Sequence, residues 1–245
     1  MNNKDSLSHR VKSGRWVFDK EVAEVFDDML FRSVPGLERA CNTANLLFSS
    51  IEKFRPSCNN YNVLDLGIGT GTTCQKIIPN PNSKAVFGID TSFEMIEKAR
   101  NSLRYTFGKV TLEQGDIKDP LPLSFPSKFG VILSVLTMMF VPPDYRLSVL
   151  QRLREALSRE GSLFIMEKTV PSSIPMIVRD SYRQYKLDSG YTVQQVNEKE
   201  ASLQGVLIPQ SPDEWERMFK VAGFESVELV FAELQFRGWL LRKTV

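Results

Sequence analysis

A glycine-rich loop directly after a short apolar strand is the feature that most constrains the fold of this chain. The loop lies in the segment Leu64-Asp65-Leu66-Gly67-Ile68-Gly69-Thr70-Gly71. Because glycine has no side chain, the backbone can turn sharply here and pass close to a ligand at the carboxyl edge of a sheet. The pattern alone also fits an ordinary strand-to-helix turn, so its meaning depends on the elements around it.

Strands and helices alternate along the chain after this loop. Hydrophobic periodicity predicts strands at 63–66, 85–90, 110–112, 130–136 and 162–167, with helices at 72–78, 92–103 and 145–157, the last ended by Gly161. This alternation predicts an α/β fold with a mostly parallel, Rossmann-like sheet. We expect 226–231 and 234–242 to close the sheet as an antiparallel pair, with one antiparallel strand at the C-terminal end. Such an ending is typical of the methyltransferase variant of this fold.

Helical segments flank this alternating part. Apolar spacing predicts helices at 21–30 and 37–51, and we expect residues 1–55 to form N-terminal cap helices. A polar helical region at 174–204 precedes a helix at 214–221, and we expect a lid-like helical insertion over 172–212. No repeat or low-complexity tract divides the chain, so one domain over 1–245 is expected.

Composition excludes several classes of protein. With 42% hydrophobic and 24% charged residues, a chain of 245 residues can bury one large core, which excludes a disordered or fibrous class. The net charge of +2 is scattered without a basic block, and the apolar stretch 131–141 is too short to span a bilayer. Cys41, Cys58 and Cys74 lack the spacing of a disulfide framework or a metal site. We therefore expect a cytoplasmic protein without metal, nucleic acid or membrane contact.

Two more loops, each after a strand, carry residues suited to an adenosine ligand. Asp90 ends the second expected strand, roughly twenty residues after the glycine loop, where a carboxylate can accept both ribose hydroxyls. Asp116 and Ile117 follow the third strand, where a carboxylate and a backbone amide can read an adenine edge. Each alone also fits a helix cap or a solvated turn. Together the three loops predict an adenosine site.

The glycine loop favours one adenosine ligand over others. Dinucleotide loops usually add a glycine where Cys74 and Gln75 stand here, and the chain has no Gly-Lys-Ser/Thr phosphate loop. The sequence therefore predicts S-adenosyl-L-methionine as the cofactor. The expected cofactor-binding residues are Asp65, Gly67, Ile68, Gly69, Gly71, Asp90, Thr91, Asp116, Ile117 and Ser134.

The sequence does not identify a catalytic base. Methyl transfer from a sulfonium mainly requires alignment of acceptor and methyl, so no catalytic triad is needed. Glu167, Tyr182 and Tyr191 are candidates for shaping an acceptor pocket, with packing as the alternative role for each. His9 is the only histidine, and we expect it at the surface.

Several stretches resemble the carboxy-S-adenosylmethionine synthases of bacterial wobble-uridine tRNA modification, within the class I S-adenosylmethionine methyltransferase superfamily. They are 18–26 (FDKEVAEVF), 32–36 (RSVPG), the glycine loop, 90–92, 95–97, 115–117, Glu167-Lys168 and Gly190-Tyr191. The first run is far more specific than the glycine loop, and the resemblance covers nearly the whole chain. It implies a homodimeric enzyme in which the region after Tyr191 helps to close the ligand site.

The chain departs from this family at three positions, which identifies it as a divergent member. Leu37 and Ser134 stand where the family has a ligand-contacting tyrosine and asparagine. Glu200 aligns with the family's arginine that pairs with the extra carboxylate of carboxy-S-adenosylmethionine, and a glutamate repels a carboxylate. If the alignment is shifted by one residue, Lys199 takes this position instead, and its side chain is then turned by about 100° around a helix.

These observations leave three functions open. We expect an S-adenosylmethionine-dependent methyltransferase acting on a small-molecule acceptor. The first alternative is a carboxy-S-adenosylmethionine synthase that uses S-adenosylmethionine and prephenate, and the second is a non-catalytic S-adenosylmethionine-binding dimer partner. The sequence does not predict the identity of the acceptor.

Overall fold

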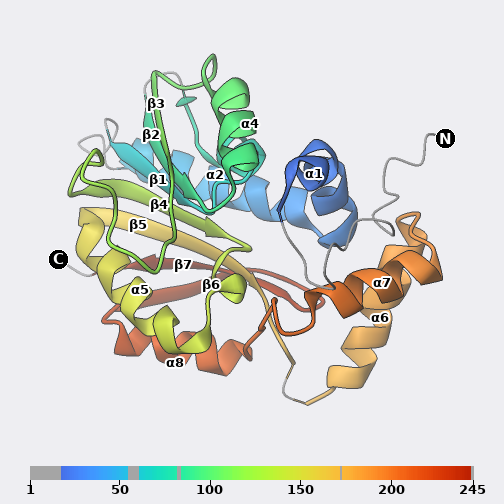
Figure 1. Cartoon of the computed structure of the whole chain (residues 1–245). Helices are drawn as coiled ribbons and strands as arrows, with labels where there is room; N and C mark the ends of the chain where they lie inside the picture. Colours follow the sequence, from blue (N-terminus) through green and yellow to red (C-terminus); the bar gives the residue numbers. More distant parts are fainter. Residues whose placement is uncertain (1–17, 55–60, 82–83, 172, 244–245) are drawn as a thin grey trace.

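The computed structural model describes residues 18–54, 61–81, 84–171 and 173–243, so His9 and Cys58 lie outside the described residues. Its centre is a seven-stranded sheet with the order β3-β2-β1-β4-β5-β7-β6 (Figure 1). The strands are β1 Asn62–Leu66, β2 Ala85–Asp90, β3 Lys109–Gln114, β4 Phe129–Val135, β5 Leu157–Lys168, β6 Ser226–Glu233 and β7 Phe236–Arg242. Strands β1 to β5 are parallel, and β7 is antiparallel to both β5 and β6. The predicted fold class is confirmed.

Helices cover both faces of the sheet. They are α1 Lys20–Ser33, α2 Leu37–Phe54, α3 Thr72–Ile77, α4 Phe93–Leu103, α5 Pro143–Ala156, α6 Pro175–Asp188, α7 Val193–Leu203 and α8 Pro212–Val221, with a short 3-10 helix, η5, at Met138–Phe140. Buried residues of α2, α3 and α4 pack with one face, and those of α5 and α8 pack with the other. The hairpin of α6 and α7 projects from the same side of the molecule as α1 (Figure 1).

Side-chain caps set the start of several helices, as the sequence predicts for α4. The Ser92 hydroxyl accepts the Met95 amide at 3.2 Å, and Asp19 caps α1 in the same way. Both α7 and α8 begin with a capping box, at Thr192 and Ser211, where two otherwise unpaired amides are satisfied reciprocally.

The prediction that Gly161 ends a helix was wrong. Helix α5 ends at Ala156 and β5 begins at once, so Gly161 lies inside a strand. The pairing of β4 with β5 shifts register nearby, between Phe129 and Val131. A Cβ at Gly161 would lie 2.9 Å from the Phe129 carbonyl oxygen. The glycine is therefore needed for close strand packing and does not end the helix.

The polar helical region at 174–204 is two helices with a sharp turn between them. The turn contains Gly190, whose φ of 90° lies in the left-handed region that favours glycine. The short helix η5 was not predicted from the sequence. No helix in the described part of the chain is long and apolar enough to cross a membrane.

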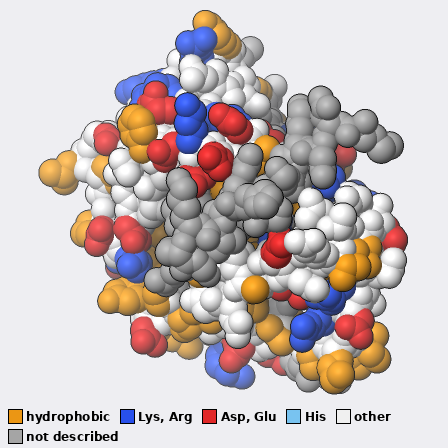
Figure 2. All heavy atoms as spheres, turned by 45° about the vertical axis from the view of Figure 1, so that its right-hand side comes forward, with side chains coloured by type: hydrophobic (Ala, Val, Ile, Leu, Met, Phe, Trp, Pro, Cys, Tyr) orange, Lys and Arg blue, Asp and Glu red, His pale blue; other side chains and the backbone are white. Residues whose placement is uncertain are grey.

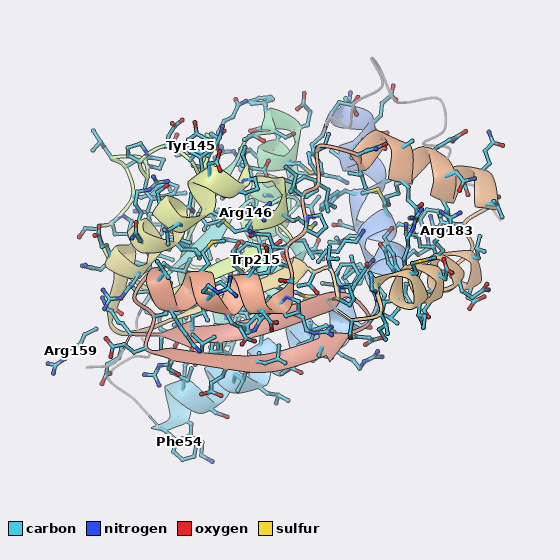
Figure 3. The ribbon with its side chains drawn as sticks, turned by 90° about the horizontal axis from the view of Figure 1, so that it is seen from below. Phe54, Tyr145, Arg146, Arg159, Arg183 and Trp215 are labelled. Atoms are coloured by element: carbon cyan, nitrogen blue, oxygen red, sulfur yellow. The ribbon has the colours of Figure 1, made fainter. Side chains whose placement is uncertain are left out.

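The face covered by α8 contains a buried arginine. Arg146 on α5 lies over the Trp215 ring of α8, with its guanidinium carbon 5.3 Å from the ring centroid (Figure 3). It donates to the carbonyl oxygens of Val141 at 2.8 Å and Ile208 at 2.6 Å. These bonds join the segment after η5 to the segment before α8, and both segments line the cavity described next.

Candidate functional site

A cavity of about 780 Å³ lies at the carboxyl ends of the first strands, between the sheet, α1 and the α6–α7 hairpin. Its lining includes the glycine loop, the loops after β2, β3 and β4, and Lys168 just inside the end of β5. Phe26, Met29 and Leu30 of α1 add an apolar wall. The carboxyl edge of a doubly wound sheet is where such folds bind ligands.

The glycine loop has the backbone that the sequence predicts for close approach to a ligand. Gly67, Gly69 and Gly71 all have positive φ, at 61°, 55° and 81°. A Cβ at Gly67 would lie 2.5 Å from the Thr137 hydroxyl oxygen, so no larger residue fits there. The amides of Gly67 and Ile68 both donate to the Ile89 carbonyl oxygen, which fixes the loop to β2.

Asp90 joins the glycine loop to the start of α4. One carboxylate oxygen accepts the Gly69 amide and the other accepts the Ser92 amide, both at 2.9 Å. Burial raises the pKa of Asp90, and these backbone hydrogen bonds oppose that shift. The carboxylate lies at the cavity wall beside the glycine loop.

The loop after β3 lines the cavity with Gly115, Asp116, Ile117 and Lys118. The Asp116 carboxylate accepts the Lys118 amide at 2.9 Å and forms an ion pair with the Lys118 ammonium at 3.2 Å. Arg152 on α5 donates to the Ile117 carbonyl oxygen at 2.6 Å, which fixes this loop against the sheet. The predicted residues that line the cavity are Gly67, Ile68, Gly69, Asp90, Thr91, Asp116 and Ile117.

Asp65, Gly71 and Ser134 lie behind the cavity wall and not in its lining. Burial raises the pKa of Asp65 well above its ordinary value, and the charge of Asp90 adds to this shift. Asp65 shares a hydrogen bond with the Cys74 thiol, and both residues are buried under the loop. Gly71 is required by packing, since a Cβ there would lie 2.8 Å from the Leu103 side chain.

The three candidate acceptor-side residues occupy different environments. Glu167 lies below the cavity wall, where its carboxylate accepts the amides of Met138 at 2.8 Å and Met139 at 3.0 Å. Burial raises the pKa of Glu167 to about 8. Tyr182 lines the cavity and Tyr191 does not.

Both tyrosines bind the last residue of α1. The Tyr182 hydroxyl donates to the Ser33 carbonyl oxygen at 2.8 Å, and the Tyr191 hydroxyl shares a 2.9 Å hydrogen bond with the Ser33 hydroxyl. Burial raises the pKa of each tyrosine, so both stay protonated at neutral pH. They connect the α6–α7 hairpin to α1.

Basic side chains form a cationic wall on the hairpin side of the cavity, and the sequence pattern did not predict most of it. Lys168, Arg179, Lys186 and Lys199 all line the cavity there. Only Lys199 was singled out for its charge, and Lys168 appeared only within the Glu167-Lys168 match. Arg179 and Lys186 share one face of α6, but Lys168 comes from β5 and Lys199 from α7, so no single spacing in the sequence brings all four together.

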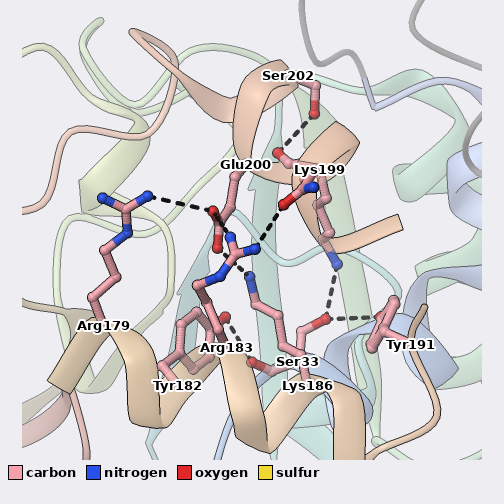
Figure 4. Close-up of polar contacts among 10 residues, drawn as sticks. Ser33, Arg179, Tyr182, Arg183, Lys186, Tyr191, Lys199, Glu200 and Ser202 are labelled. Atoms are coloured by element: carbon pink, nitrogen blue, oxygen red, sulfur yellow. Dashed lines mark hydrogen bonds and ion pairs between the residues drawn. The ribbon is translucent and has the colours of Figure 1, made fainter. Parts of the chain in front are cut away.

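Glu200 lies in the same wall, and its charge is compensated within the hairpin. Its carboxylate pairs with Lys186 at 3.5 Å, with Arg179 at 3.9 Å, and with Arg183 (Figure 4). All three cations belong to α6. Glu200 therefore holds α6 to α7 and does not make the cavity wall negative.

Known proteins resemble this chain in sequence and in fold. A family model described as a methyltransferase domain matches residues 57–223. The carboxy-S-adenosyl-L-methionine synthase of Wolinella succinogenes is 32% identical over 98% of both chains. That of Nautilia profundicola is 31% identical over 98% of this chain and 99% of its own.

Solved structures share the fold at lower identity. The plantazolicin methyltransferase BpumL, in complex with a triazolic desmethylPZN analog and SAH, has a TM-score of 0.63 at 17% identity, covering 90% of both chains. A DhpI-SAM-HEP complex has a TM-score of 0.58 at 21% identity, covering 91% of this chain and 93% of that one.

Proposed function

This chain belongs to the carboxy-S-adenosyl-L-methionine synthase family of methyltransferase-domain proteins, and we propose that its cavity transfers the methyl group of S-adenosylmethionine to a small-molecule acceptor. One observation carries the proposal. The glycine loop and the Asp90 carboxylate meet at the carboxyl edge of the sheet, where the Gly69 amide donates a hydrogen bond to the carboxylate. This arrangement supports binding of an adenosine ligand at that edge.

The residues at this edge fit S-adenosylmethionine. Gly67 and Gly69 line the cavity, and Gly67 has to remain a glycine because an added Cβ would meet Thr137. Asp90 offers a carboxylate for the ribose hydroxyls, and Asp116 with Ile117 offers polar groups for the adenine edge. When bound, the cofactor supplies an electrophilic methyl group on a sulfonium.

The rest of the cavity supports an acceptor site. Phe26, Met29 and Leu30 form an apolar wall that excludes water, and the hairpin covers the cavity from the other side. Methyl transfer then depends on holding the acceptor in line with the methyl group, which a cavity lined from several sides favours. We propose that α6 and α7 form a lid over the cavity and that α1 and α2 form an N-terminal cap. We also propose that residues 1–245 form a single domain.

A turnover experiment tests this proposal. The protein should release S-adenosylhomocysteine from S-adenosylmethionine when mixed with the small-molecule fraction of a cell extract. The macromolecular fraction should give no release above background. No release with either fraction, in protein that binds the cofactor, would favour a non-catalytic binding protein.

Carboxy-S-adenosylmethionine synthase is the second candidate function. The names of the relatives favour it. The cationic wall also favours it, because Arg179, Arg183 and Lys186 of α6 compensate the charge of Glu200 and leave the wall able to accept a carboxylate. Incubation with S-adenosylmethionine and prephenate, followed by mass spectrometry, separates the two candidates. Methyl transfer as the main activity predicts no carboxylated cofactor, and its formation would favour the synthase.

We propose that the protein acts in the cytoplasm as a homodimer without direct nucleic-acid contact. Ile174, Met176, Ile177 and Val193 expose apolar side chains on the hairpin and just before it, which supports a partner surface there. On the face shown in Figure 2, acidic and basic side chains are interspersed. Such a mixture does not favour a phosphate backbone.

A further inference from the structure

The two connections between the α6–α7 hairpin and the sheet meet at one place. Residues after Lys168 lead from β5 into α6, and residues after Leu203 lead from α7 into α8. The Val170 amide donates to the Gln210 carbonyl oxygen at 3.0 Å, and Thr169 pairs with Gln210 as an isolated bridge. We call residues 169–170 and 207–210 the hairpin base. Its two chain segments are joined by backbone pairing, so they form one unit.

Arg146 binds the hairpin base and η5 at the same time. Its side chain is fully buried on α5. The guanidinium donates to the Ile208 carbonyl oxygen at 2.6 Å and to the Gln210 side-chain oxygen at 2.8 Å, both in the hairpin base. It also donates to the carbonyl oxygens of Met139 at 3.3 Å and Val141 at 2.8 Å, at the end of η5. One side chain therefore joins two segments that lie far apart in the sequence.

The shape of the guanidinium suits this junction. It is planar and carries five donors in a fixed fork, so it holds several acceptors at set positions relative to one another, which a lysine ammonium does not. The Trp215 ring, with its centroid 5.3 Å from the guanidinium carbon, packs against Arg146 (Figure 3). The Ile208 amide adds a backbone bond to the Met139 carbonyl oxygen at 2.9 Å. Arg146 thus fixes the end of η5 relative to the hairpin base.

The start of η5 is bound on the other side, next to the glycine loop. The Glu167 carboxylate accepts the amides of Thr137 at 3.2 Å and Met138 at 2.8 Å. The Thr137 hydroxyl donates to the carbonyl oxygen of Leu66, directly before the glycine loop, at 2.9 Å. A buried carboxylate therefore holds the amide end of this turn, and the buried guanidinium holds its carbonyl end. Hydrogen bonds connect the glycine loop to the hairpin base through η5.

Both ends of this chain of contacts line the cavity. Leu136, Thr137 and Phe140 line it at the turn, and Leu207 and Pro209 line it at the hairpin base. Arg146 lies behind them and is not part of the lining. A ligand that contacts the turn restricts its movement, and the hydrogen bonds of Arg146 extend this restriction to the hairpin base.

We infer that Arg146 is a positioning residue that couples the cofactor edge of the cavity to the α6–α7 hairpin. Binding of the cofactor then holds the hairpin in place over the rest of the cavity, where the acceptor would bind. The inference rests on the proposed function, because it takes this cavity as the site of S-adenosylmethionine. Coupling of this kind means that a ligand at one edge changes the opening of a distant element.

Amide hydrogen exchange with and without S-adenosylhomocysteine tests the coupling. In the wild type, saturating ligand should slow exchange in α6 and α7 by about tenfold, a typical scale for coupling between two sites. Arg146→Lys keeps the charge and loses the fork, so the slowing should fall below about twofold. An arginine that only stabilised the fold would speed exchange equally with and without the ligand. The ratio of the two rates would then stay as in the wild type.

Two further variants complete the experiment. Arg154→Lys is the matched control, because Arg154 also lies on α5 and donates to a carbonyl oxygen, that of Gly223, outside the cavity lining. It should keep the slowing of the wild type. Gln210→Met removes one acceptor of Arg146 and keeps the backbone pairing with Val170. Its slowing should lie between those of the wild type and Arg146→Lys, and it decides the question if Arg146→Lys does not fold.

The affinity of each protein for S-adenosylhomocysteine is measured by calorimetry, so that every exchange experiment is run at saturation. Slowing as in the wild type in Gln210→Met or Arg146→Lys would overturn the inference. So would an equal loss in Arg154→Lys, or wild-type protein that binds the ligand without slowing in the hairpin. These results would leave the proposed function in place. No binding by the wild type would overturn the proposed function, and this inference with it.

Discussion

Glu167 shows how one buried side chain can shape the cavity without lining it. Its carboxylate holds the amides of Met138 and Met139 at the start of η5. Just before η5, Leu136 lines the cavity. Its φ of 58° is a backbone angle that residues other than glycine rarely adopt. We interpret Glu167 as a positioning residue, because its hydrogen bonds over-determine a turn that would otherwise be strained.

The raised pKa of Glu167 predicts a pH-dependent stability. A carboxyl group whose pKa is higher in the folded than in the unfolded protein contributes its full stabilisation when the pH lies below its pKa in the unfolded protein. This contribution is lost as the pH rises toward about 8. The wild type should therefore lose stability relative to Glu167→Gln between pH 5 and pH 8, as measured by urea unfolding. Glu228→Gln, at an exposed position of β6, is the control. A stability difference between the wild type and Glu167→Gln that stays constant with pH would contradict the account.

Two glycines with positive φ provide a matched test of the cofactor loop. Gly67 and Gly205 have φ of 61° and 72°, but an added Cβ meets Thr137 at Gly67 and nothing within 4 Å at Gly205. Gly205→Ala should cost about 1–2 kcal/mol of unfolding free energy, from backbone strain alone. Gly67→Ala should cost about 1–3 kcal/mol more, because Thr137 must move. Equal losses in urea unfolding would show that the loop has room for a side chain.

The sequence predicted that the loops after the strands meet at one edge of the sheet, but it did not predict the cationic wall. The glycine loop, Asp90 and Asp116 each follow a strand, and parallel strands bring their carboxyl ends to one edge. Their proximity therefore follows from the fold class. Lys168, Lys186 and Lys199 meet only because the hairpin folds back over the sheet, which depends on contacts to Ser33 that no local pattern encodes.

At the scale of elements, the α6–α7 hairpin is attached to the end of α1. Ser33 accepts the Tyr182 hydroxyl with its carbonyl oxygen, and its own hydroxyl bonds to Tyr191 and Lys199. The last carbonyl groups of a helix lack partners within the helix, so α1 offers acceptors at this point. Glu200 joins the two hairpin helices to each other.

Ser33→Ala should loosen the hairpin without unfolding the sheet. The variant removes the hydroxyl partner of Tyr191 and Lys199 and keeps the carbonyl partner of Tyr182. Amide hydrogen exchange should speed up by about 30-fold in α6 and α7, because two hydrogen bonds of about 1 kcal/mol each are lost. Exchange in β1 and β4 should not change.

Ser148→Ala, at an exposed position of α5, is the control for this exchange experiment. Unchanged protection of α6 and α7 in Ser33→Ala would contradict the attachment.

The bounds of helices and strands were predicted well where capping residues and hydrophobic periodicity agree. They were predicted less well where packing against distant residues sets the bounds. Ser92 caps α4 as expected, because the cap depends on neighbours three residues away. Gly161 was misplaced, because its role is set by the distant carbonyl oxygen of Phe129. The break at Gly190 was missed, because the polar helical pattern continues on both sides of it.

At the scale of the whole molecule, strand direction follows from the alternating pattern and the C-terminal hairpin, whereas the order of the strands is known only from the structure. What the sequence left open is how the hairpin and α1 enclose the cavity, since these helices pack over the edge of the sheet by side-chain contacts. The apolar residues that the hairpin exposes to solvent bear on how the whole molecule associates.

We predict that the protein is a dimer in solution. Burial of the exposed apolar residues near and on the hairpin would stabilise association through the hydrophobic effect. Light scattering should report about twice the chain mass of 27.9 kDa. Met176→Asp should shift the protein toward the monomer, whereas Leu123→Asp, at another exposed apolar position, should not. A wild-type monomer at tens of micromolar would contradict the prediction.

The central claim is that S-adenosylmethionine binds at the edge where Asp90 meets the glycine loop. Calorimetric titration of the wild type, Asp90→Ala and the exposed α8 control Asp213→Ala tests it most directly. Asp90→Ala should weaken binding by about 1.5–3 kcal/mol, the scale of hydrogen bonds to a charged group, and Asp213→Ala should not. Unchanged affinity in a folded Asp90→Ala protein, or no binding by the wild type, would contradict the account.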